Sequence, residues 1–442
     1  MRRLFGTDGI RGEAGVPPLD GGTVSRVGAA LGDSLRVPGR PEPVRVVVGG
    51  DTRESTGSIV AALTGGLAAT GARVAYAGVV PTPAVAWLVT ALDLDAGISV
   101  SASHNPWRDN GIKLFSPKGR KLPDEVEAAI ECRIDASVPA APRAASPDPA
   151  LARLYVHHLA GSLPHRLDGL TVVLDAANGA AFEIAPAAFR AAGARVVTLA
   201  ASPDGRNINE RCGALHPEAM ARAVVAHGAD LGLALDGDAD RIVLADGSGR
   251  LLDGDDVLYL WTHELIRESR KPAAVVGTVM SNFGLERALS ALGVALLRAP
   301  VGDRYVVEEM EKRGALLGGE PSGHLIRSDL TTTGDGTLTG LHLAALVAAS
   351  GKPLASQPRF DHTPQVLKNV RVRERVPLAE APALGRAVAE AERCLDGAGR
   401  ILVRYSGTEP LLRIMVEGPD AALVESLATA LVESARNALG AA

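Results

Sequence analysis

Few residues in this sequence are of the kinds that mark secreted or membrane-spanning proteins. Only three of the 442 residues are cysteines, Cys132, Cys212 and Cys394, and aromatic residues make up 3%. An odd number of widely spaced cysteines excludes a disulfide framework and is typical of a reducing compartment. No uncharged apolar run approaches the roughly 20 residues of a membrane helix, and no secretory signal follows Arg2 and Arg3. We therefore expect a cytoplasmic protein without a membrane partner.

A basic charge and nucleotide-binding patterns are also lacking. The formal net charge is -5 at pH 7, whereas a nucleic-acid binder usually presents a basic face, so we expect no nucleic-acid partner. The P-loop pattern is absent because Gly351-Lys352 is followed by Pro353, and none of the G-x-G pairs is completed to G-x-G-x-x-G. The sequence therefore gives no support to ATP-driven or nicotinamide-dependent chemistry.

What the sequence does contain is a repeated α/β pattern. Apolar residues make up 46% of the chain, and a β-rich run, a Gly- or Asn-containing loop, a helix and a second apolar run recur in three copies. These copies begin near Pro43, Thr171 and Ala273. Runs this apolar are typical of parallel strands that are covered on both faces and joined by βαβ crossovers. The last ~75 residues alternate strands and helices as a smaller α+β module.

The breaks along the chain define the expected domains. Length alone predicts about three domains of roughly 150 residues, but the patterns indicate four modules. Residues 135–149 are rich in Pro and Ala, as is typical of a linker. We predict an α/β protein with three similar domains of mixed, largely parallel sheets and a smaller C-terminal α+β domain. The predicted bounds of the four domains are residues 1–150, 151–254, 255–365 and 366–442.

The first segment that can carry chemistry covers residues 97–113, where an apolar strand ends in small residues. The small neighbours let a bulky anionic group approach Ser101 or Ser103 closely. A serine here can act as a nucleophile, or can carry a phosphoryl group where positive charge surrounds it. A polar turn without chemistry stays open as the alternative, because Ser, Asn and Pro are common turn residues.

Three carboxylates, those of Asp236, Asp238 and Asp240, alternate directly after an apolar strand. Carboxylates crowded in this way repel one another unless a hard divalent cation lies among them, and Mg²⁺ prefers oxygen ligands. An EF-hand does not fit, because Arg241 stands where that loop needs glycine and Gly247 where it needs glutamate. We predict a Mg²⁺ site, with a solvated Asp-rich turn as the alternative.

Two further segments carry polar side chains suited to a phosphorylated sugar. Glu320, Ser322 and His324 share a Gly/Pro-rich loop, and a carboxylate, a hydroxyl and an imidazole suit sugar hydroxyls. A later segment places two arginines and two hydroxyls around a glycine turn between predicted strands, which suits a phosphate. A structural histidine and a hairpin with surface arginines are the respective alternatives. The residues of this later segment are Arg404, Ser406, Gly407, Thr408 and Arg413.

Taken together, these segments resemble the α-D-phosphohexomutase superfamily, and most closely its phosphoglucosamine mutase family. The resemblance spans nearly the whole chain, with the motifs in the same order as in the family. The motifs that carry it are FGTDGIRG (5–12), SASHNP (101–106), DGDADR (236–241), VGDRYV (301–306), GEPSGH (319–324), TTTGDG (331–336) and RYSGTEPLLR (404–413).

The resemblance implies four domains around a central cleft. In chain order, the first domain carries a phosphoserine, the second binds a metal, the third binds the sugar and the fourth binds a phosphate. It implies that Ser103 is phosphorylated and binds one Mg²⁺ per subunit together with Asp236, Asp238 and Asp240. Lys113 and His324 are its candidates for proton transfer. The implied catalytic residues are Ser103, His104, Lys113, Arg11, Arg241 and His324. The implied substrate-binding residues are Glu320, Ser322, His324, Arg304, Arg404, Ser406, Gly407, Thr408 and Arg413.

The implied activity is that of an isomerase, an intramolecular phosphotransferase. It interconverts glucosamine 6-phosphate and glucosamine 1-phosphate through a bound 1,6-bisphosphate, in the supply of UDP-N-acetylglucosamine and peptidoglycan precursors. A glucosamine or glucose 1,6-bisphosphate is implied as activator, and a homodimer as assembly. Pro321 stands where glutamine or asparagine is usual in the family, and proline donates no backbone hydrogen bond. Glucose and mannose phosphates therefore stay open as substrates. A phosphatase and a non-catalytic phosphosugar sensor are the alternatives from other classes.

Overall fold

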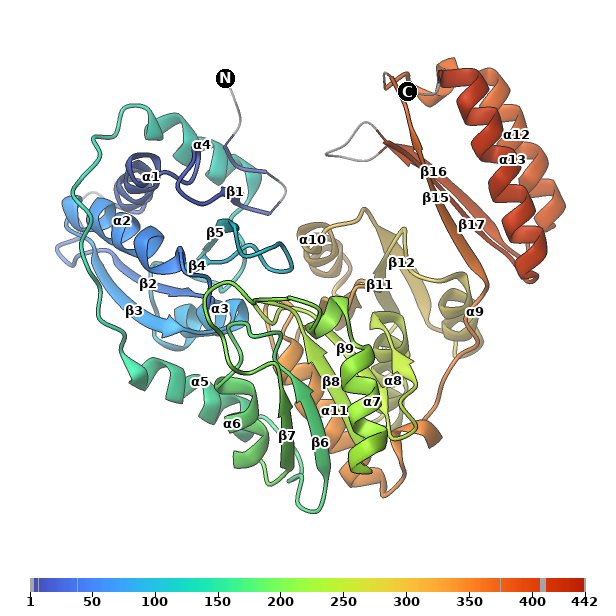
Figure 1. Ribbon diagram of the computed structural model, residues 1–442, viewed down its shortest axis with the longest axis horizontal. Helices are drawn as coiled ribbons and strands as arrows, with labels where there is room; N and C mark the ends of the chain where they lie inside the picture. The colour runs from blue at the N-terminus through green and yellow to red at the C-terminus, as the bar shows by residue number, and fades with distance from the viewer. Residues whose placement is uncertain (1–3, 7, 38, 374, 406–410, 441–442) are drawn as a thin grey trace.

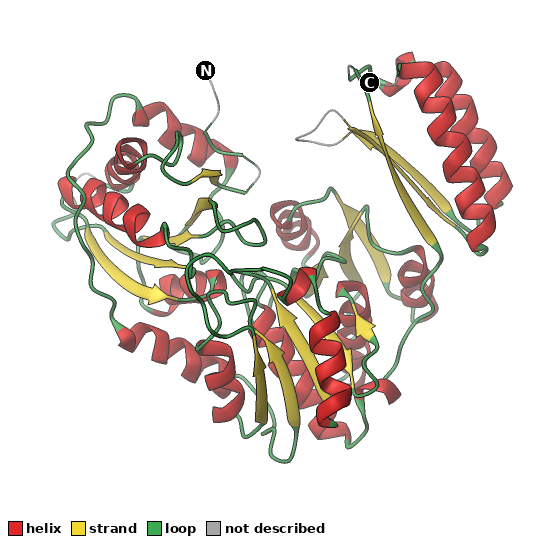
Figure 2. Ribbon diagram, viewed as in Figure 1, coloured by secondary structure: helices red, strands yellow, loops and turns green. Residues whose placement is uncertain are grey.

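The computed structural model contains four sheets, each covered by helices (Figure 1, Figure 2). The four units follow one another along the chain, from the N-terminal unit at the left of Figure 1 to the C-terminal unit at the right. The residues that the structure describes are 4–6, 8–37, 39–373, 375–405 and 411–440.

The first unit is a mixed sheet with strand order β1-β5-β4-β2-β3. β2 is parallel to β3 and β4, and β5 runs antiparallel to both of its neighbours. The strands are β1 (Ile10–Glu13), β2 (Arg45–Gly50), β3 (Arg73–Val79), β4 (Ala96–Val100) and β5 (Asp109–Phe115). The helices are α1 (Gly21–Ser34), α2 (Thr56–Ala69), α3 (Thr82–Ala91) and α4 (Asp124–Ile134). After the predicted linker, α5 (Pro149–Gly161) leads to the second unit.

The second unit repeats this plan with strand order β10-β9-β8-β6-β7. β6 is parallel to β7 and β8, while β9 is antiparallel to β8 and β10. The strands are β6 (Thr171–Asp175), β7 (Arg195–Leu199), β8 (Leu231–Leu235), β9 (Ile242–Asp246) and β10 (Leu251–Leu252). The helices are α6 (Ile184–Ala191), the short η1 (Gly213–Leu215) and α7 (Glu218–His227).

The third unit has the strand order β12-β11-β13-β14, with the first three strands parallel and β14 antiparallel. Its last long helix, α11, packs against β8, β9 and α5, so it covers the second sheet rather than its own. The strands are β11 (Ala274–Thr278), β12 (Ala295–Ala299), β13 (Leu317–Gly319) and β14 (Leu325–Arg327). The helices are α8 (Gly254–Arg267), α9 (Phe283–Ala291), α10 (Asp303–Arg313), α11 (Gly336–Ser350) and η2 (Leu354–Ser356).

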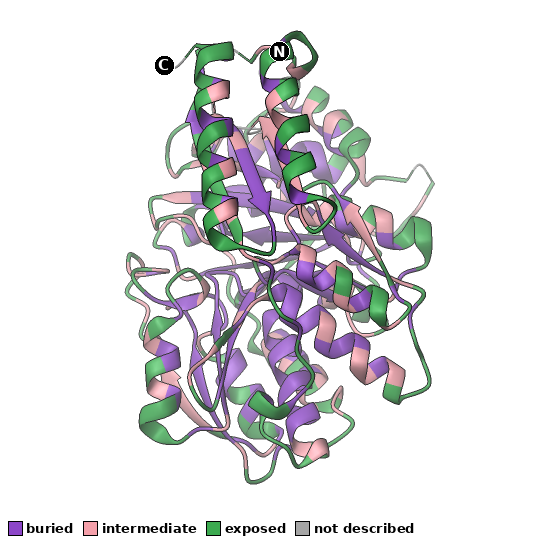
Figure 3. Cartoon of the chain, turned by 90° about the vertical axis from the view of Figure 1, so that its right-hand side faces the viewer, coloured by how far each residue is buried: buried purple, intermediate pink, exposed green. Residues whose placement is uncertain are grey.

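The C-terminal unit is an antiparallel sheet with strand order β15-β17-β16. Two helices cover one face of this sheet, and their outer sides are exposed (Figure 3). The strands are β15 (Gln365–Arg371), β16 (Arg400–Tyr405) and β17 (Leu411–Glu417). The helices are η3 (Leu378–Glu380), α12 (Pro382–Leu395) and α13 (Ala421–Leu439).

The first three units all contribute to one large apolar cluster, whereas none of the described members of that cluster comes from the sheet or helices of the fourth unit. The largest buried cluster includes Leu88 of α3, Trp261 of α8 and Leu341 of α11. The C-terminal cluster, which includes Ile414 and Leu431, draws its described members from that unit alone. Because the apolar cores do not merge, the C-terminal unit is attached to the rest of the molecule by its linker and by polar contacts at one edge of its sheet.

Hydrogen bonds at one edge fix this attachment. Asn282 precedes α9 and pairs with the linker, donating from Nδ2 to the carbonyl oxygen of Thr363 and accepting from the Thr363 N–H, at 3.0 and 2.9 Å. Arg400 of β16 donates to the carbonyl oxygen of Ser281 at 2.7 Å. The N–H of Phe283 donates to Glu417 of β17 at 3.0 Å. The loop before α9 thus anchors both the linker and the sheet.

The predicted fold class is confirmed by these sheets. Each predicted repeat forms a βαβ crossover: β2-α2-β3, β6-α6-β7 and β11-α9-β12. Within the described part of the chain, every helix falls short of the length and apolarity that a membrane crossing requires. The exact domain bounds stay a prediction.

Candidate active site

Ser103 lies in the loop after β4 and faces the second unit. Its φ of +52° is left-handed, which is uncommon for a residue other than glycine. The side chain is almost completely buried, and its Oγ donates a hydrogen bond to Oδ2 of Asp236 at 2.5 Å. The Ser103 N–H donates to Oγ of Ser101 at 3.0 Å. Ser101, the other candidate serine, therefore supports the loop, while the hydroxyl of Ser103 points at the carboxylates.

Three polar side chains hold this loop in place, and the motif analysis did not assign them. Arg53 is fully buried in an ion pair with Asp51 and donates to the carbonyl oxygen of Ser103 at 3.1 Å. Asn209 of the second unit donates to the same carbonyl at 3.0 Å. Asp51 also accepts a hydrogen bond from Ser101 at 2.5 Å. The only sequence signal for these contacts is the Asp51–Arg53 loop that follows the first repeated strand.

The three predicted aspartates come together beside Ser103. Asp236 directly follows β8, and a left-handed Ala239 (φ +57°) turns the chain so that Asp238 and Asp240 point back. All three are buried, and one oxygen from each lies within 4.8 Å of the others. Among the described residues, Oδ1 of Asp238 and Oδ1 of Asp240 have no hydrogen-bond partner. Buried carboxylate oxygens without donors fit a hard divalent cation.

Lys113 of β5 neutralises part of this negative charge. Its Nζ lies 2.8 Å from Oδ2 of Asp238 and 3.2 Å from Oδ2 of Asp240. Burial would lower the pKa of Lys113, but Asp238 and Asp240 outweigh it and raise that pKa well above the usual value. Burial raises the pKa of Asp236, and the negative charge of Asp240 raises it further. Burial and the crowded carboxylates therefore disfavour ionisation of Asp236, and a divalent cation among the three would offset this.

The remaining predicted catalytic residues surround the same point. His104 Nδ1 lies 3.2 Å from Oγ of Ser103 and 3.4 Å from a guanidinium nitrogen of Arg241. Burial, followed by the charges of Arg241 and Arg11, lowers the pKa of His104 to about 4, so this imidazole is neutral at pH 7. Arg11 donates to the carbonyl oxygen of Ala102 at 3.1 Å. The structure thus gathers these side chains around the Ser103 loop.

His324 and the predicted sugar loop lie against the metal cluster. Nδ1 of His324 is 3.7 Å from Oδ2 of Asp240, and its Nε2 accepts a hydrogen bond from the N–H of Gly334 at 3.1 Å. On the same loop, Ser322 donates to Oε2 of Glu320 at 3.3 Å. Glu320 is 7% exposed, and its other oxygen accepts from the Gly302 N–H at 2.9 Å. The carboxylate is therefore fixed in position by its neighbours.

The structure places Arg304 elsewhere. Its guanidinium forms an ion pair with Asp124 and, at 3.0 Å, with Glu127, both of which belong to α4 of the first unit. Arg304 therefore joins α10 to α4. Its role in substrate binding stays a prediction.

The structure describes only part of the predicted phosphate segment. Arg404 of β16 and Arg413 of β17 are paired in register, which puts both side chains on the same face of the C-terminal sheet. Burial, followed by the charge of Arg413, lowers the pKa of Arg404. Ser406, Gly407 and Thr408 lie outside the described residues.

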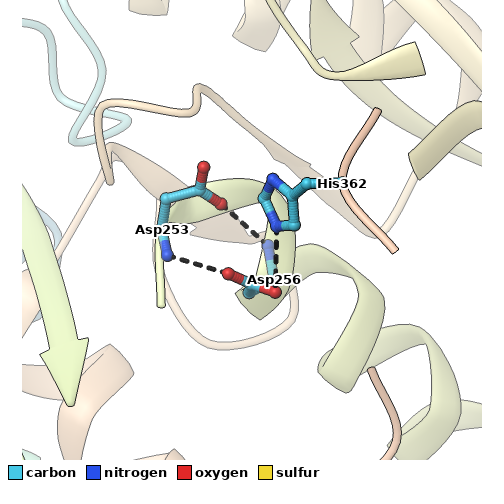
Figure 4. Close-up of side chains that lie close together, drawn as sticks. All are labelled: Asp253, Asp256 and His362. Carbon is cyan, nitrogen blue, oxygen red and sulfur yellow. Dashed lines mark hydrogen bonds and ion pairs between the residues drawn. The ribbon is translucent and has the colours of Figure 1, made fainter. Parts of the chain in front are cut away.

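A second acidic cluster has the composition of a metal site but a different internal structure (Figure 4). Asp253 is the N-cap of α8 and accepts from the N–H groups of Asp255 and Asp256 at 3.0 and 3.1 Å. Asp256 in turn accepts from the Asp253 N–H at 3.1 Å. His362 of the C-terminal linker lies 3.2 Å from Oδ1 of Asp256. The contacts between Asp253 and Asp256 form a capping box, which satisfies backbone N–H groups at the start of α8.

Family models match the chain in four consecutive segments. They are described as phosphoglucomutase/phosphomannomutase alpha/beta/alpha domains I, II and III and the C-terminal domain of the same family. The matched residues are 2–139, 153–249, 253–359 and 367–434, respectively. Together they cover most of the chain.

Individual proteins match over their whole length. The phosphoglucosamine mutase of Anaeromyxobacter dehalogenans is 48% identical over 459 residues, covering 99% of this chain and 100% of the relative. That of Solibacter usitatus is 48% identical over 445 residues, covering 99% of each chain. A crystal structure of a phosphoglucomutase/phosphomannomutase family protein from Burkholderia thailandensis superposes with a TM-score of 0.82 at 27% identity, covering 100% of this chain and 99% of that one. The similarity therefore extends over all four units.

Proposed function

The chain belongs to the phosphoglucomutase/phosphomannomutase family, and from that premise we propose that it interconverts glucosamine 6-phosphate and glucosamine 1-phosphate. It is a phosphohexomutase, an isomerase that moves a phosphoryl group within one hexose phosphate. The observation that carries the choice of glucosamine is the 48% identity to phosphoglucosamine mutases along the full chain.

Ser103 is the proposed carrier of the phosphoryl group. Its Oγ lies at the carboxylate cluster, 2.5 Å from Asp236, and neutral His104 and cationic Arg241 stand beside it. Ser103, Asp236, Asp238 and Asp240 would hold one Mg²⁺. When bound, this ion neutralises negative charge on the transferring group, the main requirement of phosphoryl transfer.

In the proposed reaction, the free hydroxyl of the sugar attacks phosphorus on Ser103. The bond from phosphorus to Oγ of Ser103 breaks, a bond to the sugar oxygen forms, and the hydroxyl proton passes to a base. Because its carboxylate neighbours keep Lys113 protonated, Lys113 supplies positive charge. His324 is therefore the proposed proton acceptor. The 1,6-bisphosphate then reorients, and its other phosphoryl group returns to Ser103.

Substrate binding is assigned to two loops on different units. Glu320 and Ser322, already oriented toward each other, bind sugar hydroxyls. The phosphate that does not react binds the C-terminal unit. Its proposed ligands are Arg404, Ser406, Gly407, Thr408 and Arg413. For Arg304, binding the substrate would mean leaving its ion pairs with α4.

The separate core of the C-terminal unit supports the reorientation step. Either end of the bisphosphate must occupy the same phosphate site in turn, so this site has to release and recapture its ligand. A unit that does not share the main core can move as a body and then exclude water. Excluding water matters because transfer to water would produce free phosphate.

Mass spectrometry and one pair of variants test the carrier. We expect one phosphoryl group on the peptide that contains Ser103. Ser103→Ala should lose mutase activity and the phosphoryl group while still binding glucosamine 6-phosphate. Ser101→Ala is the matched control, because its hydroxyl contacts Asp51 rather than the cluster, and it should retain the modification. A phosphoryl group on Ser101, or an active Ser103→Ala, would contradict the assignment.

The second candidate function is the same reaction on glucose or mannose phosphates, which Pro321 in the sugar loop keeps open. A coupled assay with the three hexose 1-phosphates separates these readings. Faster turnover of glucose 1-phosphate or mannose 1-phosphate would overturn the glucosamine proposal. Release of inorganic phosphate without isomerisation would indicate a phosphatase, and binding without turnover a sensor.

The physiological setting follows from this reaction. We propose that the enzyme acts in the cytoplasm, in the supply of UDP-N-acetylglucosamine and peptidoglycan precursors, and that a glucosamine or glucose 1,6-bisphosphate restores phosphorylation of Ser103 when it is lost. Its partner is the phosphosugar itself. A homodimer is the proposed assembly, and light scattering at micromolar concentration tests it.

A further inference from the structure

Lys121 joins two parts of the active site that lie on different units. It follows a turn after β5, the strand that carries Lys113, and its side chain is only 10% exposed. Its Nζ pairs with Oδ1 of Asp8 in the first unit, and with Oδ2 of Asp303 in the third unit at 2.5 Å. One buried ammonium thus lies between two carboxylates from the two sides of a domain boundary.

On the first side, this ion pair leads to the phosphoryl-transfer site. Asp8 also pairs with Arg11, and its Oδ2 lies 3.6 Å from Nζ of Lys113. Lys113 contacts Asp238 and Asp240 at 2.8 and 3.2 Å. Each step is a direct contact between charged side chains, so three contacts, through Asp8 and Lys113, connect Lys121 to the proposed metal ligands.

On the other side, the ion pair leads to the sugar carboxylate. Asp303 is the first residue of α10, and Gly302 directly precedes it. The N–H of Gly302 donates to Oε1 of Glu320 at 2.9 Å. The position of the α10 N-terminus therefore sets the position of Glu320, and Lys121 is one of the groups that hold this N-terminus against the first unit.

We propose that Lys121 is a positioning residue for the mutase reaction. By bridging Asp303 and Asp8, it holds Glu320 of the sugar loop in place relative to Ser103 and Asp236. This inference rests on the proposed function, because it assumes that Glu320 binds the sugar and Ser103 carries the phosphoryl group. Lys121 itself need not touch the substrate. Its effect passes through the α10 N-terminus.

The electrostatics support a single defined arrangement. Burial raises the pKa of Asp303, but the charge of Lys121 outweighs it and lowers that pKa below the usual value. Without the ammonium, Asp8 and Asp303 would be two like charges facing each other across the boundary, and they would repel. A shift of the sugar by about 1 Å relative to the reacting group can cost roughly 100-fold in rate. Binding would change less, because the sugar loop itself stays intact.

The same domain boundary provides a matched control. Arg120, the residue before Lys121, pairs with Glu311 further along α10, and the Glu311 side chain is 54% exposed. Arg120→Met therefore removes one cation from the same boundary without touching Asp8 or Asp303. If the boundary needs only a general attraction between the units, Arg120→Met and Lys121→Met should behave alike.

The experiment measures kcat and KM for glucosamine 6-phosphate in the full-length enzyme, together with the thermal midpoint of each variant. We expect Lys121→Met to lower kcat by at least ~30-fold and to change KM by less than about threefold, as a positioning defect predicts. Lys121→Arg, which keeps the charge, should recover most of kcat. Arg120→Met should stay within about twofold of the unaltered enzyme, as is usual for an exposed ion pair.

Asp303→Asn removes the other end of the bridge if Lys121→Met does not fold. Because Oδ2 of Asp303 also lies 3.7 Å from Nε2 of His324, the pH profile of kcat is measured too, and it should keep its shape if the loss is one of positioning. Asp303→Asn should lower kcat as Lys121→Met does, and the double variant should be no worse than either single one. The proposal is overturned if Lys121→Met raises KM with kcat unchanged, because Lys121 would then bind the substrate directly. It is also overturned if Lys121→Met and Arg120→Met are equivalent. An unaltered enzyme that isomerises no hexose phosphate would instead refute the proposed function.

Discussion

Two acidic clusters among the described residues differ in how their carboxylates are hydrogen-bonded. Asp236, Asp238 and Asp240 gather three buried carboxylates, two of which keep an oxygen with no partner among the described residues. Asp253 and Asp256, with His362, also place three potential ligand atoms within 4.8 Å (Figure 4). In the second cluster, however, the carboxylates accept hydrogen bonds from backbone N–H groups and face the imidazole.

Composition therefore does not distinguish these two clusters, whereas the hydrogen bonding of their carboxylate oxygens does. A carboxylate oxygen that already accepts a hydrogen bond has little to gain from a cation. A buried carboxylate oxygen without a donor retains its desolvation cost until a ligand arrives. The first cluster lies at the carboxyl end of β8, beside Ser103, and the second at the start of α8. The predictions below test this contrast in order of expected effect.

The largest effect should follow the loss of one carboxylate from the first cluster. Asp238→Asn should lower kcat/KM at least ~100-fold, since it weakens Mg²⁺ binding and removes charge stabilisation from the transferring group. The measurement is the coupled mutase assay at saturating Mg²⁺. Asp256→Asn in the second cluster is the control and should keep the activity. Equal losses in the two variants would abolish the distinction.

The next largest effect should be the stabilisation of the fold by Mg²⁺, which should depend on the first cluster and not on the second. At a Mg²⁺ concentration about 100 times its Kd, the unaltered protein should gain roughly 2.7 kcal/mol in unfolding free energy by mass action. Asp236→Asn should remove this gain, whereas Asp253→Asn should preserve it. Thermal unfolding with and without a chelator measures the effect. If the Mg²⁺-dependent gain disappeared in Asp253→Asn, the metal would bind the second cluster, and its assignment to the first cluster would be wrong.

The second cluster should act on stability alone. Asp253→Ala removes the side chain that accepts from two N–H groups at the start of α8, and loss of such an N-cap costs about 1 kcal/mol. Asp253→Asn is the matched variant, because asparagine also caps helices well. Urea unfolding should show the loss only for alanine. Similar mutase activity in both variants would complete the case for a structural role.

The smallest effect should be the pH dependence of the His362–Asp256 pair. The hydrogen bond to Asp256 raises the pKa of His362 above its usual 6.5. The pair therefore stabilises the fold fully below pH 6.5, and this contribution disappears as pH rises through the raised pKa. His362→Gln should cost less than about 1 kcal/mol at pH 6, since the side chain is 38% exposed, and nothing at high pH. A loss that grows with pH would contradict this sign.

The features that could be predicted from the sequence are those encoded locally. The three βαβ repeats and the alternating aspartates follow from short periodic patterns, and the structure bears both out. The contact of Arg53 with the Ser103 carbonyl joins residues 50 positions apart, and Lys121 meets Asp303 across a domain boundary. Such pairs depend on how the units dock, which no local pattern specifies.

Two further arrangements also depend on how the units dock. Arg304 stands in a motif that the resemblance links to substrate binding, a role that stays a prediction, and its guanidinium pairs with two carboxylates of α4. α11 belongs by sequence position to the third domain but covers the second sheet, since its apolar surface meets β8 and β9. In both cases, the neighbour that a side chain finds is decided by tertiary packing.

The left-handed backbone of Ser103 sets stability against activity at a single residue. A side chain in this region costs on the order of 1–2 kcal/mol, and glycine would remove the cost. Glycine would also remove Oγ, and with it the proposed chemistry. A search for stabilising substitutions would therefore favour Ser103→Gly, the change that would remove the proposed phosphoryl carrier. Thermostability engineering of this protein should accordingly leave the loop of residues 101–105 unchanged and look for its gains elsewhere.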